Sequence, residues 1–384
     1  METQKLYYEN CHLREFSATV IGCEEREKGY IVTLDRTAFY PEGGGQACDL
    51  GTLGDARVLD VRESGESVQH LCDRPLPVGK TVTGSIDWER RFDQMQQHTG
   101  EHIVSGILHR LLGAHNVGFH MGTDVTTIDF DVPVPAELLS RVEQEANEAV
   151  FANLPVECSY PSEEALIKIP YRSKKALPWP VRIVEVPGYD ICACCGVHVA
   201  RTGEIGIIKL LSCVKFHEGV RIEMVCGKKA LSLLDRIYEQ NKLVSQAFSA
   251  KLLETGAAAQ KMSEALAAEK FRTTGLERQL FDRIAGDYEN AGNVVYFAEG
   301  LQPASVRELA DRIGKKCGGI GAVFSGDDES GYQVCLVCKD GDVKALGQAM
   351  NQALCGRGGG KAGFHQGSVK ATRAQIEAFF KEQN

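Results

Sequence analysis

The segment His98-Thr99-Gly100-Glu101-His102 lies in a stretch whose apolar spacing predicts a helix. Its two histidines are four residues apart, so their side chains lie one above the other on one face of that helix. The distant segment Cys194-Cys195-Gly196-Val197-His198 adds a thiol and a third imidazole, again four residues apart. Three nitrogens and one sulfur form a ligand set that suits zinc. The two segments together predict one zinc ion, bound by His98, His102, Cys194 and His198.

Each half of this motif is ambiguous when it is taken alone. A histidine pair on a helix is more often a surface or core feature than a metal site. The second segment is crowded with three cysteines, of which only Cys194 has the four-residue spacing to His198. Cys195 is the nearer rival and Cys192 the further one. The occurrence of both halves in one domain favours the zinc site, while the choice between Cys194 and Cys195 stays open.

The chain as a whole has the composition of a globular protein. It has 384 residues, of which 43% are hydrophobic and 25% charged, and a net charge of −9; this length predicts two or three domains. The 14 cysteines are scattered and follow no secretory signal, so we expect no disulfide framework. The sequence has no apolar run long enough to span a membrane, which predicts a cytoplasmic protein. The negative charge disfavours a general nucleic-acid binder but leaves room for a local basic groove.

Residues 1–88 predict a small antiparallel β-barrel domain, because short strands alternate with turn residues. We expect the strands at 17–21, 30–34, 56–61, 68–71 and 81–86. The run Gly43-Gly44-Gly45-Gln46 is too costly in backbone entropy to lie inside a strand or helix. It predicts a loop whose backbone approaches another group closely, and a plain tight turn is the alternative.

Residues 89–228 predict an α+β domain that carries the zinc site. An apolar helix face extends to Leu112, and Gly113 predicts the end of that helix. We expect a hairpin over 117–130, a second helix from about 135 to 153, and strands at 181–186, 205–211 and 220–225. Strands and helices in this order are typical of an α+β fold.

Residues 229–288 predict a helical arm, and residues 289–384 predict a separate C-terminal α/β domain. Gly256 and Gly275 are expected to break or bend the arm, for which a solvated spacer is the alternative interpretation. Near the C-terminus, glycines flanked by cations predict a loop that contacts an RNA backbone, with a structural turn as the alternative. The residues of this stretch are Arg357, Gly358, Gly359, Gly360 and Lys361.

These motifs resemble a known family. His98-x-x-x-His102 followed by Cys194-x-x-x-His198 resembles the editing domain of alanyl-tRNA synthetase and its free-standing AlaX-type relatives. Residues 35–46 are similar to the glycine-rich loop of their N-terminal barrel, and residues 117–122 to the segment that lines their amino-acid pocket. Residues 358–361 are similar to part of the terminal domain that contacts tRNA and supports dimerisation. Cys-Cys-Gly-Val-His stands here where the family usually has Cys-Gly-Gly-Thr-His, with the same spacing.

The resemblance implies a long AlaX-type trans-editing protein, because the predicted barrel begins near Met1 and leaves no room for an aminoacylation domain. It implies a zinc-dependent aminoacyl-tRNA deacylase that hydrolyses seryl- or glycyl-tRNA(Ala), with the four zinc ligands as the catalytic centre. Such editing is needed because a pocket that fits alanine rejects an added hydroxyl only about 10²-fold. The implied partners are the acceptor end and elbow of tRNA(Ala), and a second copy bound through the C-terminal region. The implied substrate-binding residues are Gly44, Gly45, Gln46, Gly118, Phe119 and His120.

Two other functions remain open from the sequence. One is an editor of another mischarged tRNA, such as seryl-tRNA(Thr), because that editing domain shares both halves of the motif. The other is a non-catalytic tRNA-binding module with a structural zinc, because four protein ligands close a tetrahedron whereas a catalytic zinc usually keeps an open position. A deacylation panel of charged tRNAs distinguishes the three.

Overall fold

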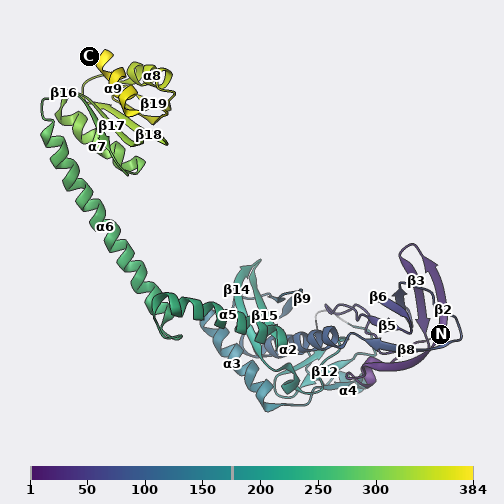
Figure 1. Cartoon of the computed structure of the whole chain (residues 1–384). Coiled ribbons are helices and arrows are strands. Elements are labelled where there is room, and N and C mark those ends of the chain that lie inside the picture. The colour runs from purple at the N-terminus through teal and green to yellow at the C-terminus, as the bar shows by residue number, and fades with distance from the viewer. Residues whose placement is uncertain (1, 174–176, 384) are drawn as a thin grey trace. The chain divides into compact units, whose positions relative to one another are not determined.

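In the computed structural model, which describes residues 2–173 and 177–383, six strands near the N-terminus pair antiparallel in the closed order β2-β3-β7-β6-β5-β8 (Figure 1). Their bounds are β2 Glu15–Arg26, β3 Gly29–Leu34, β5 Gly51–Leu53, β6 Ala56–Ser64, β7 Ser67–Cys72 and β8 Thr81–Ile86. Buried and outward positions alternate along β8, where Val82, Gly84 and Ile86 point inward. The five predicted strands lie within β2, β3, β6, β7 and β8. The three residues of β5 are too few for alternation to be recognised.

The helix that carries the first histidine pair is α2, Trp88–Leu112, and it follows β8 directly. The Asp87 side chain caps its N-terminus by accepting a hydrogen bond from the Arg90 backbone N–H at 3.2 Å. Gly113 ends it in the left-handed conformation with φ 66°, and the Gly113 N–H donates to the His109 carbonyl. The helix and its end are therefore confirmed as predicted.

A buried ion pair joins α2 to the segment that precedes β5. The Arg91 and Asp49 side chains have no exposed surface. Arg91 Nε donates to both Asp49 carboxylate oxygens at 2.9 Å, and Arg91 Nη2 donates to Asp49 and, at 2.6 Å, to the Ala38 carbonyl. Asp49 also accepts from the Tyr40 backbone N–H at 2.6 Å. Because each charge compensates the other away from water, the loss of either one leaves an unpaired buried charge.

A four-stranded sheet packs beside α2 in the order β14-β15-β10-β9. Its bounds are β9 Asn116–Met121, β10 Thr126–Phe130, β14 Ile208–Phe216 and β15 Gly219–Cys226. Helix α3, Ala136–Ala152, shares one hydrophobic core with this sheet and α2, in which Ile103, Ile128, Val142 and Ile222 are fully buried. The second helix and the hairpin are confirmed. Residues 202–205 form a 3-10 turn, Thr202–Ile205, so the predicted strand at 205–211 begins later, at Ile208.

A small three-stranded sheet, β11-β12-β13, delivers the cysteine–histidine segment. Its bounds are β11 Glu157–Ser159, β12 Ile183–Val186 and β13 Asp190–Ala193. The predicted strand at 181–186 begins later, at Ile183, and β13, which was not predicted, pairs with it and turns the chain back before Cys194. The remaining short elements of this part are β1 Gln4–Lys5, α1 Leu6–Glu9, β4 Arg36–Thr37 and α4 Glu163–Leu166.

The chain divides into two compact units, Met1–Leu243 and Val244–Asn384, so the four predicted domain ranges stay predictions. The predicted arm consists of α5, Gly227–Phe248, and α6, Thr255–Asp287. The break lies between them, and the prediction that Gly256 or Gly275 breaks the helix is wrong, since both lie inside α6. One glycine in a helix interior costs only about 1 kcal/mol, which is too little to end a long helix. None of the helices in the described residues is long and apolar enough to cross a membrane.

The second unit contains a five-stranded sheet in the order β16-β17-β18-β20-β19, so the mixed α+β class is confirmed for the chain. The bounds are β16 Gly292–Ala298, α7 Pro303–Lys316, β17 Gly318–Asp327, β18 Gly331–Cys338, α8 Lys344–Ala353, β19 Arg357–Lys361, β20 Phe364–Val369 and α9 Arg373–Glu382. One sheet face packs with α7 and the end of α6 in one hydrophobic cluster, and the other face packs with α8 and α9.

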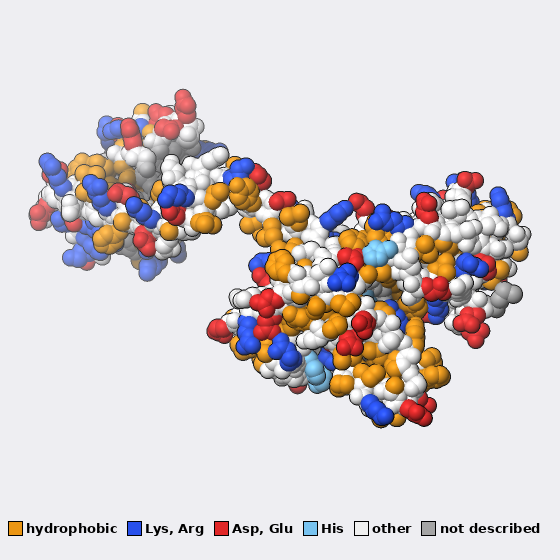
Figure 2. Space-filling view, turned by 90° about the horizontal axis from the view of Figure 1, so that it is seen from below, with side chains coloured by type: hydrophobic (Ala, Val, Ile, Leu, Met, Phe, Trp, Pro, Cys, Tyr) orange, Lys and Arg blue, Asp and Glu red, His pale blue; other side chains and the backbone are white. Residues whose placement is uncertain are grey.

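The glycine-rich stretch near the C-terminus is the edge strand β19, so its prediction as a loop is wrong. Glycine permits the close pairing with β20, since a Cβ at Gly360 would lie 1.9 Å from the Phe364 carbonyl oxygen. All five residues of β19 are exposed. On the face of the molecule in Figure 2, Lys and Arg side chains are interspersed with Asp and Glu rather than gathered. Whether β19 contacts RNA therefore stays a prediction.

Candidate metal centre

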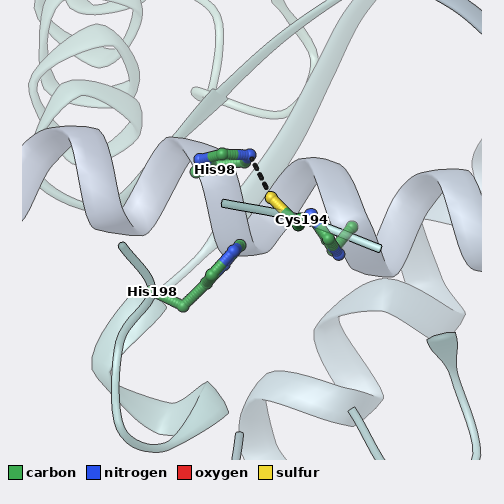
Figure 3. A group of neighbouring side chains, drawn as sticks. His98, Cys194 and His198 are labelled. Atoms are coloured by element: carbon green, nitrogen blue, oxygen red, sulfur yellow. Dashed lines mark hydrogen bonds between the residues drawn. The ribbon is translucent and has the colours of Figure 1, made fainter. Parts of the chain in front are cut away.

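The four predicted ligands come together in the structure. His98 and His102 lie in the middle of α2, Cys194 follows β13 directly, and His198 comes four residues later. One ligand atom from each side chain lies within 4.8 Å of the others. His98 Nε2 is 3.4 Å from Cys194 Sγ, and Figure 3 shows His98 and His198 beside the thiol. The three imidazoles are almost fully buried.

The His98 ring is oriented by Gln46, which lies at the end of the glycine run. The Val197 backbone N–H donates to Gln46 Oε1 at 3.1 Å, which identifies this atom as the amide oxygen. His98 Nδ1 lies 3.0 Å from the same oxygen and must therefore be the protonated nitrogen. In the neutral ring this leaves Nε2, the nitrogen that faces Cys194, without a proton, as a metal ligand requires.

The other two imidazoles each have a polar side chain beside Nδ1. His102 Nδ1 and Asp190 Oδ2 are 2.9 Å apart, at ion-pair distance. His198 Nδ1 lies 3.2 Å from Thr99 Oγ1, whose own proton is donated to the Met95 carbonyl at 2.8 Å, so Thr99 accepts from the ring. His198 Nε2 is buried and has no hydrogen-bond partner among the described residues. Each ring thus has a polar neighbour at Nδ1, which leaves Nε2 as the atom that can bind a metal, and one ligand atom of each ring lies within 4.8 Å of the thiol sulfur.

The charges of the cluster favour metal binding as well. Burial alone would raise the pKa of the Cys194 thiol, but His98 and His102 outweigh it and hold that pKa well below its usual range. Burial, reinforced by His98, lowers the pKa of His198 to about 3. The cluster thus offers a thiolate from Cys194 and a neutral imidazole from His198, which are the forms that bind metal. Burial alone would lower the pKa of His102, but Cys194 and Asp190 outweigh it and raise that pKa well above its usual range, so His102 must release a proton when it binds a metal.

Cys194 rather than Cys195 joins the histidines. The Cys195 thiol lies instead near the Tyr40 hydroxyl, 3.9 Å away. Burial and the neighbouring Cys194 raise the pKa of the Cys195 thiol, which keeps it protonated. Gly196 lets the loop pass over the site, because a Cβ there would lie 2.1 Å from His98 Cε1. Arg182 holds the loop by donating to the Cys194 and Gly196 carbonyls at 2.9 and 2.8 Å.

A cavity of about 870 Å³ opens onto the cluster, with His98, His102 and Cys194 in its wall. Of the predicted substrate-binding residues, Gly44, Gly45 and Phe119 line this cavity. Gln46 is buried behind His98 instead. Gly118 and His120 pair with Asp129 and Thr127 of β10, on the strand face opposite to Phe119, and are not among the lining residues.

Sequence reasoning missed the carboxylate that supports His102. Asp190 also receives a two-pronged contact from Arg172, with distances of 2.7 and 2.9 Å. Burial alone would raise the pKa of Asp190, but His102 and Arg172 outweigh it and keep the carboxyl ionised. The signal that could have revealed Asp190 is the Pro187-Gly188 turn, with Gly188 at φ 80°, which predicts a hairpin and hence a new strand.

We expect Asp190→Ala to weaken metal binding about 10- to 100-fold, the usual cost of losing a carboxylate behind a ligating histidine. Competition with a chromophoric chelator measures the change. Asp129→Ala is the matched control, because Asp129 forms the same two-pronged pair with Arg221, at 2.7 and 2.8 Å, away from the cluster. Equal affinity of Asp190→Ala and Asp129→Ala would contradict the role of Asp190.

Comparison with known proteins adds a second line of argument. The family described as "Threonyl and Alanyl tRNA synthetase second additional domain" matches residues 181–223, and "tRNA synthetases class II (A)" matches residues 2–90. The chain is 33% identical to an alanine–tRNA ligase of Thermofilum pendens, over 97% of this chain and 43% of that protein. It is 36% identical to the alanine–tRNA ligase of Ignicoccus hospitalis, over 63% of this chain and 28% of that protein. It is 29% identical to the alanyl-tRNA editing protein Aarsd1 of Mus musculus, over 97% and 96%. The chain thus spans less than half of the ligases' length.

Proposed function

Because the chain is homologous along nearly its whole length to alanyl-tRNA editing proteins and alanine–tRNA ligases, we propose that it is a trans-editing deacylase. Its substrates would be seryl- or glycyl-tRNA(Ala), and its partner the acceptor end of that tRNA. The site would hold zinc, bound by His98, His102, Cys194 and His198. The observation that carries the proposal is the common orientation of three imidazoles around a thiolate in the wall of one cavity.

The cavity can accept more than an amino acid. A volume of about 870 Å³ lies within the range of sites that enclose a drug-sized molecule, so an aminoacyl group attached to a nucleoside has room. When bound, zinc supplies a Lewis acid that polarises an ester and activates water near neutral pH. The protein residues orient the other participants: Gln46, Thr99 and Asp190 fix the rings, and Phe119 forms a wall beside His98.

The rest of the proposal concerns the tRNA body and the second unit. Arg357 and Lys361 stand at the two ends of the exposed strand β19, where both cations can reach a phosphate backbone. We propose that this strand contacts tRNA and that the C-terminal region supports a homodimer. We also propose that the protein acts in the cytoplasm. Its proposed domains are residues 1–88, 89–228, 229–288 and 289–384.

The test is a panel of charged tRNAs incubated with the protein, before and after zinc is removed with a chelator. Rapid loss of serine or glycine from tRNA(Ala), abolished by chelator and restored by zinc, supports the proposal. Preference for seryl-tRNA(Thr) would assign a different editor. Binding of tRNA without cleavage of any ester would leave only a binding module.

We expect the combined Gln46→Ala and Phe119→Ala substitutions to lower kcat/KM for seryl-tRNA(Ala) about 10- to 100-fold, because His98 loses the hydrogen bond that sets its orientation. Single-turnover deacylation measures this change. Gln69→Ala, on β7, is the control, and its rate should equal that of the unmodified protein. Unchanged deacylation in the double variant would contradict the role given to these two residues.

A further inference from the structure

One wall of the cavity contains a buried acidic side chain that the metal cluster does not use. Glu101 precedes His102 on α2, is at least nine-tenths buried, and lines the cavity. Its Oε1 atom accepts a hydrogen bond from Ser105 Oγ at 2.5 Å and another from Asn116 Nδ2. Its Oε2 atom receives no hydrogen bond from any described residue. One carboxylate oxygen is therefore held by the protein, and the other is left for a donor from the cavity.

Asn116 adds a second unused acceptor. This side chain, at the start of β9, is also more than nine-tenths buried and lines the same cavity. Because Glu101 accepts from the Asn116 amide nitrogen, the amide cannot flip without placing two oxygens against each other. Its Oδ1 atom is consequently fixed, buried and without a hydrogen-bond partner among the described residues. An unpaired buried acceptor of this kind costs free energy unless a ligand supplies the missing donor.

The free oxygen of Glu101 lies beside a metal ligand. Glu101 Oε2 is 4.0 Å from His102 Nε2, the nitrogen that faces the cluster. Two cationic groups lie near Glu101, but Arg172 Nε and Nη2 already donate to Asp190, and His102 Nδ1 faces Asp190 as well. The subsite thus offers a carboxylate oxygen close to a metal ligand, with the free Asn116 acceptor next to that carboxylate.

We propose that Glu101 and Asn116 bind the α-ammonium group of the aminoacyl ester. This inference rests on the proposed deacylase function and assigns a specificity to it. An ammonium group carries positive charge and three N–H donors and has no acceptor, which complements the subsite. Its nitrogen is one carbon away from the ester carbonyl, so an anchor for it must lie close to the metal. An acylated nitrogen has no charge and one donor, so the subsite should reject peptidyl and other N-blocked esters.

The test compares seryl-tRNA(Ala) with N-acetyl-seryl-tRNA(Ala), in the unmodified protein and in Glu101→Gln. We expect the unmodified protein to cleave the acetylated ester with a kcat/KM about 10- to 100-fold lower, the loss typical of one hydrogen bond to a charged group. Glu101→Gln should lose a similar factor on seryl-tRNA(Ala), keep its zinc content, and cleave the acetylated ester within about twofold of the unmodified protein. Glu101→Asp should recover part of the loss.

The control and the contrary outcomes are distinct. Glu24→Gln removes an exposed carboxylate of β2 that is paired with Arg26 and is not among the residues lining the cavity, and it should change neither rate. Equal cleavage of the two esters by the unmodified protein, or an equal loss on both in Glu101→Gln, would overturn the inference. If the unmodified protein cleaves neither ester, the deacylase proposal fails. Binding of 3′-serylamido-3′-deoxyadenosine against its N-acetyl form, measured by calorimetry, then decides the inference alone.

Discussion

The double variant Cys194→Ala, His198→Ala is expected to retain no stoichiometric zinc and to deacylate seryl-tRNA(Ala) about 10³-fold more slowly than the unmodified protein. Two of four ligands are lost, and with them the thiolate that His98 and His102 stabilise. Removing the Lewis acid costs several kcal/mol of transition-state stabilisation, and each 1.4 kcal/mol is a factor of ten in rate. Elemental analysis of the purified protein and single-turnover deacylation measure the two effects.

The neighbouring cysteine supplies the control for this experiment. Cys195→Ala removes a thiol one residue away, whose sulfur lies near Tyr40 and outside the cluster. It should keep both the zinc and the zinc-dependent rate within about twofold. Unchanged zinc in the double variant would refute the ligand assignment. Zinc loss in Cys195→Ala would move the sulfur ligand to the adjacent residue.

Asp49→Ala is expected to lower the free energy of unfolding by about 3–5 kcal/mol, because it leaves the Arg91 guanidinium buried and unpaired. The loss is larger than for a surface pair, since both side chains lack exposed area. Urea unfolding followed by tryptophan fluorescence measures the change, because Trp88 begins the helix that carries Arg91.

The double variant Asp49→Leu, Arg91→Met is the partner experiment. It removes both charges and keeps apolar volume at the same place, so it should cost less than Asp49→Ala alone. A single variant that unfolds within about 1 kcal/mol of the unmodified protein would contradict the structural role of this pair, as would a double variant that is less stable than the single one.

Local patterns were enough to predict the elements that carry the ligands. Alternation located β2, β3, β6, β7 and β8, and the apolar face ending at Gly113 located α2. The four-residue spacings selected His98, His102 and His198, because spacing on one segment is a local property. The contact between two distant segments is not a local property of the sequence. Only the presence of both motif halves in one predicted domain indicated that they meet.

The residues behind the ligands could not be found in this way. Gln46 was expected to contact substrate, yet its side chain contacts His98 Nδ1 instead. The direction of the Gln46 side chain depends on how the glycine run packs against α2, which local patterns do not show. Asp190 went unnoticed because the four residues of β13 were not recognised as a strand. Gly118 and His120 lie on β9 together with Phe119. The pleat of β9 and its irregular pairing with β10 near Asp129 decide which of these three residues faces the cavity.

The hydrogen bond between the Val197 backbone N–H and Gln46 can form only after Val197 has been synthesised. The two residues are 151 positions apart in the chain. At about 5–20 residues per second, translation separates their appearance by roughly 8–30 s. During that interval the nascent chain already holds its glycine-rich loop, but no cysteine–histidine segment exists to receive it. The proposed metal site can therefore form only late in synthesis, once the second segment has left the exit tunnel.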